Sequence, residues 1–481
     1  RLKAIIKAID TERYVTMGEN KFSRAATGDF LKLAEIMDAV GMNYGERFYD
    51  AVRSAHPDWL IYGSETSSAT RTRDSYYNPA QILGHDNRPN RHYEQSDYGN
   101  DRVGWGRTAT ESWTFDRDRA GYAGQFIWTG IDYIGEPTPW HNQDNTPVKS
   151  SYFGIIDTAG LPKNDFYLYR SEWYSAKEKP TVRILPHWNW TEETLKDRKM
   201  LVDGKVPVRT FSNAASVELF LNGESLGKKE FTKKTTEDGR PYHEGAKPSE
   251  LYLEWLVKYQ PGTLTAIARD EKGNEIARDS VTTAGEPARV RLTKEEHVIT
   301  ADGKDLSYIH YEIVDSEGNV VPTANNLVHF NLHGQGQIVG VDNGEQASRE
   351  RYKAQADGTW QRRAFNGKGV VIVKSTEKEG KFTLYADSAG LTSDSATVAT
   401  VSGKKENRHF VAFAPVKATT DVTTNPELPQ TVTAIYSDGS VEEKTVTWDV
   451  PADLLTSAGE KKVSGRVEGL ETKAEALVKV I

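Results

Sequence analysis

Glu65 is the carboxylate around which the rest of the sequence is organised. It follows an apolar run at residues 59–62, which is long enough for one buried strand, and the small polar pair Gly63 and Ser64. Parallel α/β folds carry catalytic groups at the carboxyl ends of their strands, where the chain passes into a loop. Glu65 is therefore a candidate catalytic carboxylate, and a solvated loop acid is the alternative that this stretch leaves open.

The elements that would position Glu65 alternate between helix and strand. Apolar spacing predicts helices over residues 2–9, 30–40 and 46–55, and strands over residues 14–18, 42–45, 60–63 and 126–128. This alternation is typical of a parallel sheet, whose strands carry polar residues to one common rim. Four strands make half of a (β/α)8 barrel, but the alternation alone predicts only the parallel sheet.

Length and composition narrow the class of protein. The 481 residues are too many for one core and predict several domains. A formal net charge of −8 argues against nucleic acid as the main partner. The sequence has no cysteine, which excludes disulfides, thiolate metal sites and a cysteine nucleophile, and no apolar run in it is long enough to span a bilayer.

Because the sequence starts at Arg1 inside a helical pattern, we expect it to be a piece of a longer protein.

Several runs make the sequence resemble family 2 glycoside hydrolases. Residues 43–49 contain Asn-Tyr and Phe-Tyr pairs, residues 61–65 read Ile-Tyr-Gly-Ser-Glu, and residues 124–133 read Gly-Gln-Phe-Ile-Trp-Thr-Gly-Ile-Asp-Tyr. The runs at 135–140 (Gly-Glu-Pro-Thr-Pro-Trp), 151–157 and 186–190 are similar to the bacterial β-galactosidase branch. The whole chain looks like the later half of a large surface β-galactosidase of Gram-positive cocci, which implies an extracellular, cell-wall-attached location.

The resemblance implies roles for three residues. Glu65 matches the nucleophile, Tyr44 matches the tyrosine whose hydroxyl holds that nucleophile, and Trp128 matches one wall of the galactose subsite. The chemistry agrees, since a retaining glycosidase needs an ionised nucleophile and an acid/base carboxyl about 5–5.5 Å away. An indole face also fits the apolar C–H face of a pyranose. Taken alone, Tyr44 would be a core or rim tyrosine, and Trp128 a core residue.

Four further residues are candidates for sugar contact, because strand order places them on the same rim. They are Asn20, Asp132, Trp140 and His141. The alternatives are a turn cap for Asp132, loop packing for Trp140 and a solvated side chain for His141.

The resemblance also implies that one catalytic group is missing. In this family the acid/base glutamate follows an asparagine upstream of the first helix, so it does not lie on this chain. The Gly-Asn-Glu at residues 273–275 falls between two strand-like runs, and we interpret it as a hairpin turn. Half a barrel leaves two strand edges open, so we expect the N-terminal half beside it as a separate chain or fragment. The predicted reaction needs no cofactor, and no metal-ligand spacing is visible.

Beyond about residue 180, short alternating strands with Gly, Asn and Asp turns predict β-sandwiches. The turn at 270–274 recurs at 315–319, and the last module resembles bacterial Ig-like domains. The predicted fold class is α/β followed by all-β, with the C-terminal half of a (β/α)8 TIM barrel and three Ig-like β-sandwich domains. The predicted domains are the half barrel at 1–178, two sandwiches at 179–285 and 286–402, and a small bacterial Ig-like module at 407–481.

The implied function is a retaining exo-β-galactosidase that releases terminal β-linked galactose from glycans through an intermediate on Glu65. A β-glucuronidase or β-mannosidase of the same family stays open, because Arg71, Arg73 and Arg88 lie in rim loops where one of them can receive a sugar carboxylate. A surface adhesin that uses the Ig-like tail is the third alternative. In that case the catalytic residues would be vestigial.

Overall fold

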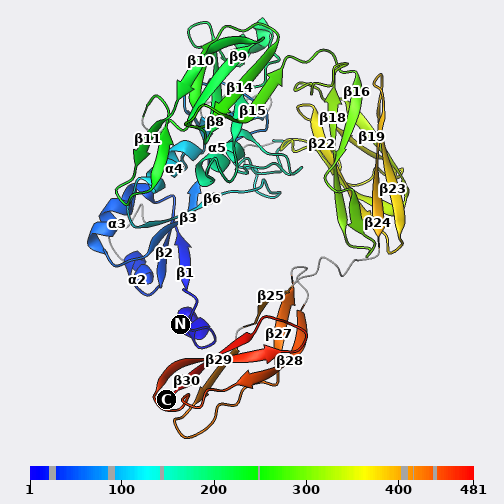
Figure 1. The fold of residues 1–481 in the computed structure, drawn as a ribbon. Coiled ribbons are helices and arrows are strands. Elements are labelled where there is room, and N and C mark those ends of the chain that lie inside the picture. The colour runs from blue at the N-terminus through cyan, green and yellow to red at the C-terminus, as the bar shows by residue number, and fades with distance from the viewer. Residues whose placement is uncertain are drawn as a thin grey trace. The chain divides into compact units, whose positions relative to one another are not determined.

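A computed structural model describes residues 1–20, 29–84, 93–140, 146–247, 250–401, 410–414, 416–436 and 441–481. These residues form two compact units (Figure 1). The first comprises Arg1–Ile299, Lys304–Thr376 and Gly380–Ala399, and the second comprises Thr300–Gly303, Glu377–Glu379 and Thr400–Ile481. The described part of the chain is mostly β-strand with few helices, and none of its helices is both long and apolar enough to span a membrane.

The four strands predicted in the first part of the chain form one parallel sheet in the order β1-β2-β3-β6. Their bounds are β1 (Thr16–Glu19), β2 (Ala39–Asn43), β3 (Ile61–Ser67) and β6 (Tyr122–Trp128). A Cβ on Gly41 would lie 2.6 Å from both the carbonyl oxygen of Met17 and the hydroxyl of Ser64. Glycine is therefore the residue that lets β1 and β2 pair beside the Ser64 side chain.

The helices that precede or connect these strands are α1 (Leu2–Lys7), α2 (Asp29–Glu35), the 3₁₀ helix η2 (Glu46–Phe48), α3 (Tyr49–Ala55) and α4 (Ala109–Arg117). Two more helices, α5 (Asn164–Trp173) and α6 (Glu192–Asp197), follow the sheet in the chain. Thr108 and Glu111 cap α4 reciprocally. A short parallel pair, β4 (Leu83–Gly84) and β5 (Asp101–Arg102), lies in the long segment between β3 and α4.

One predicted helix is too long. The apolar spacing over residues 30–40 predicted a helix that includes Val40, but α2 ends at Glu35 and Val40 lies in β2. Val40 pairs with Met17 and Ile61 on its two sides and is buried. Pairing on both edges of β2 therefore outweighs the local helical spacing, which is a weak preference by comparison.

Two sheets and a hairpin follow. The bounds are β7 (Val182–Leu185), β8 (Val206–Ser212), β9 (Ser216–Leu221), β10 (Glu224–Glu230), β11 (Thr232–Thr235), β12 (Pro241–Glu244), β13 (Leu253–Val257), β14 (Thr263–Arg269) and β15 (Glu275–Thr282). The sheets have the orders β13-β8-β7 and β10-β9-β14-β15, and β11 pairs with β12. The Gly-Asn-Glu run joins β14 to β15, which confirms the predicted hairpin.

The first sandwich shares its core with the region before it. Leu219 and Leu264 belong to the same buried cluster as Leu168 and Tyr169 of α5. Trp188 and Trp190 are buried in this cluster, so they pack instead of offering an open sugar platform.

A second pair of sheets completes the first unit, in the orders β16-β18-β22-β20 and β17-β24-β23-β19-β21. The bounds are β16 (Arg289–Lys294), β17 (Val298–Thr300), β18 (Leu306–Val314), β19 (Leu327–Gly334), β20 (Gly336–Asp342), β21 (Trp360–Arg363), β22 (Lys368–Ser375), β23 (Gly380–Ser388) and β24 (Asp394–Val401). The repeated turn is confirmed, because Asp270 accepts hydrogen bonds from the amides of residues 272 and 274, and Asp315 accepts them from residues 317 and 319.

The second unit contains a sheet with the order β25-β27-β28-β29-β30-β26. Its strands are β25 (Phe410–Phe413), β26 (Val416–Thr420), β27 (Thr431–Tyr436), β28 (Val441–Asp449), β29 (Gly459–Val467) and β30 (Ala474–Val480). β26 pairs with β30 in parallel, whereas the other described pairs are antiparallel.

Candidate active site

Four of the predicted site residues lie at the same edge of the parallel sheet. Asn20 follows β1, Tyr44 follows β2, Glu65 lies near the end of β3, and Trp128 ends β6. The register brings them to one level, since Asn43 pairs with Glu65 and Ser67 pairs with Trp128. Parallel strands present their carboxyl ends on one side, and this edge is therefore where side chains from separate strands can act on one ligand.

Glu65 sits at an irregularity of β3. Against β2, Met42 pairs with Gly63 and Asn43 pairs with Glu65, so Ser64 is an extra residue on β3. The register toward β6 shifts in the same stretch, between Gly63 and Thr66. A bulge of this kind turns side chains away from the regular alternation of a strand, and bulges are common beside active sites.

The backbone around Glu65 adopts left-handed conformations at non-glycine residues. Tyr44, Ser67 and Ser68 have φ angles of 51°, 70° and 54°. Such conformations cost energy and persist where the surrounding structure holds them, often at functional sites. One neighbour that packs against this backbone is Gly106. A Cβ added to Gly106 would lie only 2.5 Å from the carbonyl oxygen of Ser67.

Tyr44 is held against Glu65 at two points. The Tyr44 amide donates a hydrogen bond of 2.9 Å to the Glu65 carbonyl oxygen, and its hydroxyl is near enough to the Glu65 carboxylate for that charge to act on its pKa. The Ser68 hydroxyl donates to the Tyr44 hydroxyl at 2.9 Å. Burial raises the pKa of Tyr44 well above its usual range, and the charge of Glu65 raises it further. The Tyr44 hydroxyl therefore stays protonated and can serve as a donor at this edge of the sheet.

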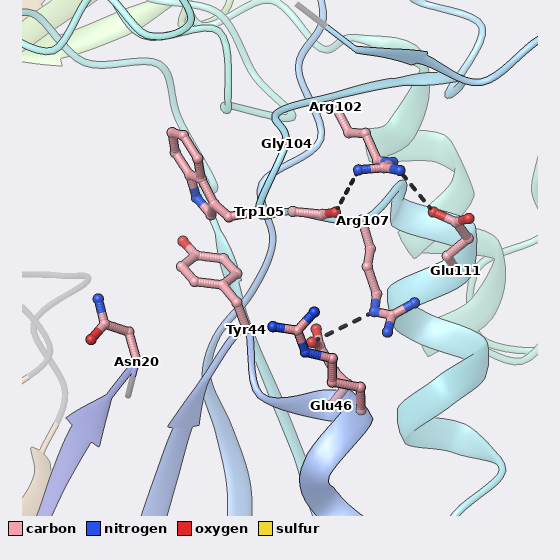
Figure 2. Close-up of a pocket in the computed structure, with 10 residues that line it drawn as sticks. Asn20, Tyr44, Glu46, Arg102, Gly104, Trp105, Arg107 and Glu111 are labelled. Atoms are coloured by element: carbon pink, nitrogen blue, oxygen red, sulfur yellow. Dashed lines mark hydrogen bonds and ion pairs between the residues drawn. The ribbon is translucent and has the colours of Figure 1, made fainter. Parts of the chain in front are cut away.

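A pocket of about 680 Å³ opens beside Tyr44 (Figure 2). It is lined by Asn20, Tyr44, Glu46, Arg47, Arg102, Gly104, Trp105, Gly106, Arg107 and Glu111. In Figure 2, Arg102 and Arg107 lie on the side of α4, and Trp105 and Tyr44 lie on the opposite side of the opening. Trp105 is 50% exposed, which is unusual for so large an apolar side chain and leaves one indole face open to a ligand.

The charged groups of this pocket are loosely paired. The closest ion-pair atoms are 3.7 Å apart for Arg107 and Glu46, and 4.0 Å apart for Arg102 and Glu111. Burial raises the pKa of Glu46, although Arg107 opposes the rise. Arg47 is exposed at the same opening. Three cations therefore face two carboxylates, one of which resists ionisation, so the pocket favours polar or anionic ligand groups.

Trp128 is fixed by the residues that follow it. Its indole nitrogen donates a hydrogen bond of 3.1 Å to the Tyr133 hydroxyl, and the two rings meet edge to face at 5.9 Å. The Tyr133 hydroxyl in turn donates to the Glu136 carboxylate. Trp128 is half-buried, and the peptide bond that follows it is cis. Its ring orientation is thus set before any ligand arrives.

Asn20 and Tyr44 line the pocket, but Glu65, Trp128, Asp132 and Trp140 are not among its lining residues. Asp132 is fully buried, and its carboxylate accepts hydrogen bonds from Lys163 at 2.6 Å, from the Gly154 amide at 2.8 Å and from Gln346 at 3.0 Å. Trp140 is buried in a cluster with Val148 and Tyr152. Both side chains are engaged in packing or an internal ion pair and cannot touch a sugar in this conformation. His141 lies outside the described residues.

Sequence reasoning missed most of the pocket wall. Arg102, Trp105 and Arg107 come from the long segment between β3 and α4, which has no periodic pattern. The signal that could have found Trp105 is its position between two glycines in a polar stretch, where an apolar core residue is not expected. Among the described residues, no group of three or more His, Asp or Glu side chains is arranged to hold a metal ion.

Asp116, a buried residue of α4, provides a test of the buried electrostatics. Gln125 donates a hydrogen bond to its carboxylate, and burial raises the pKa of Asp116 from 3.8 to about 8. The folded state thus keeps a proton that the unfolded chain loses near pH 4, so the stability this group contributes is lost as the pH rises toward 8.

We expect Asp116→Asn to remove this loss of folding stability with rising pH. The difference in unfolding free energy between wild type and variant should move in favour of the variant by a few kcal/mol between pH 5 and pH 9. Urea denaturation of both proteins at several pH values measures this difference. A difference that is constant with pH would mean that Asp116 is already ionised in the folded protein.

Comparisons with known proteins agree with the motifs. The model of glycoside hydrolase family 2 C-terminal domain 5 matches residues 290–397, a domain of unknown function matches residues 203–277, and bacterial Ig-like domain (group 4) matches residues 413–470.

Curated relatives and solved structures cover much of the chain. It is 38% identical over 397 residues to a β-galactosidase of Bacteroides ovatus, covering 81% of this chain and 42% of that protein. It is 28% identical over 211 residues to a β-glucuronidase of Formosa agariphila, covering 43% of this chain and 18% of that protein. A solved β-glycosidase from Bacteroides vulgatus matches with a TM-score of 0.65 and 26% identity, covering 83% of this chain and 48% of that one. The chain thus spans less than half the length of each.

Proposed function

We propose that this chain, which is related to family 2 glycoside hydrolases, carries the nucleophile of a retaining exo-β-galactosidase that acts on terminal β-linked galactose. The Glu65 carboxylate attacks the anomeric carbon while a glutamate upstream of this chain protonates the departing oxygen. The galactosyl ester on Glu65 is then hydrolysed by a water molecule that the same upstream glutamate deprotonates. Two displacements at one carbon return the starting configuration.

The observation that carries the proposal is the contact between Tyr44 and Glu65 at the rim of the parallel sheet. The Tyr44 amide donates a hydrogen bond to the Glu65 carbonyl oxygen, and the Glu65 charge acts on the Tyr44 hydroxyl, so the tyrosine lies where it can hold a nucleophilic carboxylate in position. Trp128, at the end of the neighbouring strand, has an indole already fixed by Tyr133 and suits the apolar face of galactose.

We propose further that the parallel sheet is the C-terminal half of a (β/α)8 barrel whose other half is a separate chain or fragment. The support comes from one face of the sheet. Phe126 on β6 is 68% exposed. Its ring meets the Tyr62 ring of β3 edge to face, with 5.9 Å between the ring centroids. The Tyr62 hydroxyl in turn lies 3.2 Å from the Thr16 hydroxyl on β1. Apolar side chains left open on one face of a sheet need a partner layer, and barrel closure supplies one.

We place the enzyme at the cell surface of a Gram-positive bacterium, attached to the wall and acting on galactose-terminated glycans. The match to a bacterial Ig-like domain supports that location.

Covalent trapping tests the proposed reaction. The chain, assembled with its upstream half, is treated with a 2-fluoro-β-galactoside that carries a dinitrophenolate leaving group, which departs with little acid help. We expect one galactosyl adduct, located by peptide mass on Glu65, and no adduct with the gluco analogue. The Glu65→Gln variant is the matched control and should stay unlabelled. An adduct on another carboxylate, or none on the assembled enzyme, would remove Glu65 from the role of nucleophile.

A β-glucuronidase is the second candidate, because arginines line the pocket beside Tyr44. Arg71 and Arg73 do not supply the cation, since both are buried and paired with Asp165 and Asp157, and Arg88 lies outside the described residues. Arg102 and Arg107 lie at the opening instead, where a uronate carboxylate can reach them. The 2-fluoro-glucuronyl analogue decides between the two sugars: labelling of Glu65 by that analogue, and not by the galacto one, would favour the glucuronidase.

A further inference from the structure

A second and larger pocket, of about 920 Å³, lies between the helices beside the parallel sheet and the first sandwich. Its walls come from α4, from α5 and the residues after it, from the β11–β12 hairpin region and from the turn between β14 and β15. It shares no lining residue with the pocket beside Tyr44. The volume falls in the upper part of the range of about 300–1,000 Å³ that is usual for ligand sites.

The apolar part of this pocket includes two partly exposed aromatic residues, of which Trp173 is held in place by ring contacts. Trp173 is 47% exposed, yet its ring packs against Tyr169 at 4.9 Å and against the edge of Trp113 at 6.4 Å. Tyr174, next in sequence, is 45% exposed, and its carbonyl oxygen accepts a hydrogen bond from Asn213. Rigid rings with one open face offer contact area to a ligand at little cost in side-chain entropy.

The polar part contains a buried donor without a partner. The Arg117 side chain is 4% exposed and binds Asp118 and Glu244 through Nε and Nη2, at 2.7 and 3.1 Å. Its Nη1 has no hydrogen-bond partner, although the guanidinium lies over the Tyr242 ring, 3.7 Å from its centroid. A buried N–H group that is left unpaired costs free energy, and Arg117 is one of the residues in the wall of this pocket.

The remaining charges of the pocket nearly balance. Arg117, Lys177, Arg240 and Lys272 line it together with Glu172, Asp270 and Glu271. The pocket therefore offers donors and acceptors without a strong net charge. Exposed aromatic faces surrounded by such groups fit the apolar C–H faces and the hydroxyls of a sugar.

We propose that this pocket is a second carbohydrate-binding site, which takes a neutral oligosaccharide across Trp173 and Tyr174 and directs a hydroxyl to Arg117. The site makes no chemical change in its ligand. It would hold the chain on a glycan while the residues at the rim of the parallel sheet act elsewhere on it.

A glycan array tests the proposal independently of catalysis. The full 481-residue chain is used as its Glu65→Gln variant, so that no hydrolysis occurs, and neutral and acidic oligosaccharides are presented side by side. We expect binding to neutral members, and Trp173→Ala and Tyr174→Ala should each weaken it about five- to tenfold in titrations with the free oligosaccharide. Tyr385→Ala is the matched control, because Tyr385 is similarly exposed at 46% but lies on the second sandwich.

Several outcomes would overturn the proposal. These are no binding to any oligosaccharide, binding that both aromatic variants retain, or binding restricted to acidic oligosaccharides. Binding that disappears when the upstream half is added would show that the pocket is an interface between the two halves. Circular dichroism of each variant checks that the fold is kept, and the two separate substitutions guard against misfolding of one. Failure of this site leaves the trapping result at Glu65 unaffected.

Discussion

Glu65→Ala should abolish hydrolysis by the assembled enzyme and allow azide to restore it with a changed product. Removing the carboxylate removes the first displacement, so kcat should fall by more than about 10³-fold, as for other catalytic nucleophiles. The deletion also leaves a space beside the anomeric carbon. Azide can enter it, form a bond to that carbon as dinitrophenolate leaves, and give α-galactosyl azide. One displacement instead of two inverts the configuration.

The configuration of the azide product makes this result specific. NMR of the product distinguishes the α from the β anomer. A β-galactosyl azide would mean that Glu65 is the acid/base residue, with the nucleophile intact elsewhere. Activity that survives the substitution would remove Glu65 from the chemistry altogether. Glu224→Ala, on exposed strand β10, is the control for removal of a carboxylate and should leave kcat unchanged.

Lys163→Met should cost about 3–5 kcal/mol of stability, because it leaves a buried charge without its partner. Lys163 and Asp132 are both fully buried and 2.6 Å apart. The Asp132 carboxylate keeps hydrogen bonds from Gly154 and Gln346 in the variant, but these do not neutralise it. Burial raises the pKa of Asp132 from 3.8 to about 6 even with Lys163 present, so the lysine only partly offsets the cost of desolvation.

The stability loss caused by Lys163→Met should depend on pH through the pKa of Asp132. Without Lys163 the pKa of Asp132 rises further, so the folded variant holds a proton that the unfolded chain releases near pH 4. The variant should therefore lose stability as the pH rises, and its deficit relative to wild type should be larger at pH 8 than at pH 5. Urea denaturation of the full chain at both pH values, followed by tryptophan fluorescence, measures the deficit.

Two further variants separate the cost of an unpaired buried charge from the cost of losing any ion pair. Adding Asp132→Asn to Lys163→Met should restore part of the stability, since it removes the unpaired charge. Lys462→Met breaks an exposed ion pair with Glu475 and should leave stability nearly unchanged. If Lys163→Met is no more costly than Lys462→Met, Asp132 does not need a counter-charge in the fold.

Local pattern was enough to predict the elements that position the site. The four strands in the first part of the chain occur in the predicted order and pair in parallel, because helix–strand alternation leaves few other arrangements. The turns at Asp270 and Asp315 were also predictable, since a single aspartate satisfies two nearby amides within five residues. The helix predicted through Val40 was wrong, because pairing with two neighbouring strands is invisible in a local window.

The sequence by itself therefore determined the order of strands, the carboxylate at the end of the third, and the tyrosine and tryptophan beside it. Only the tertiary structure decided how these side chains are arranged and which residues they contact. The bulge at Ser64 depends on the register of two neighbouring strands, and the position of Tyr44 beside Glu65 depends on the Ser68 hydroxyl that bonds to it. Asp132 was predicted to lie on the rim, but it is buried, because Lys163, which lies 31 residues later, and Gln346 of the second sandwich both bind its carboxylate. Such partners lie far apart along the chain, and packing alone brings them together.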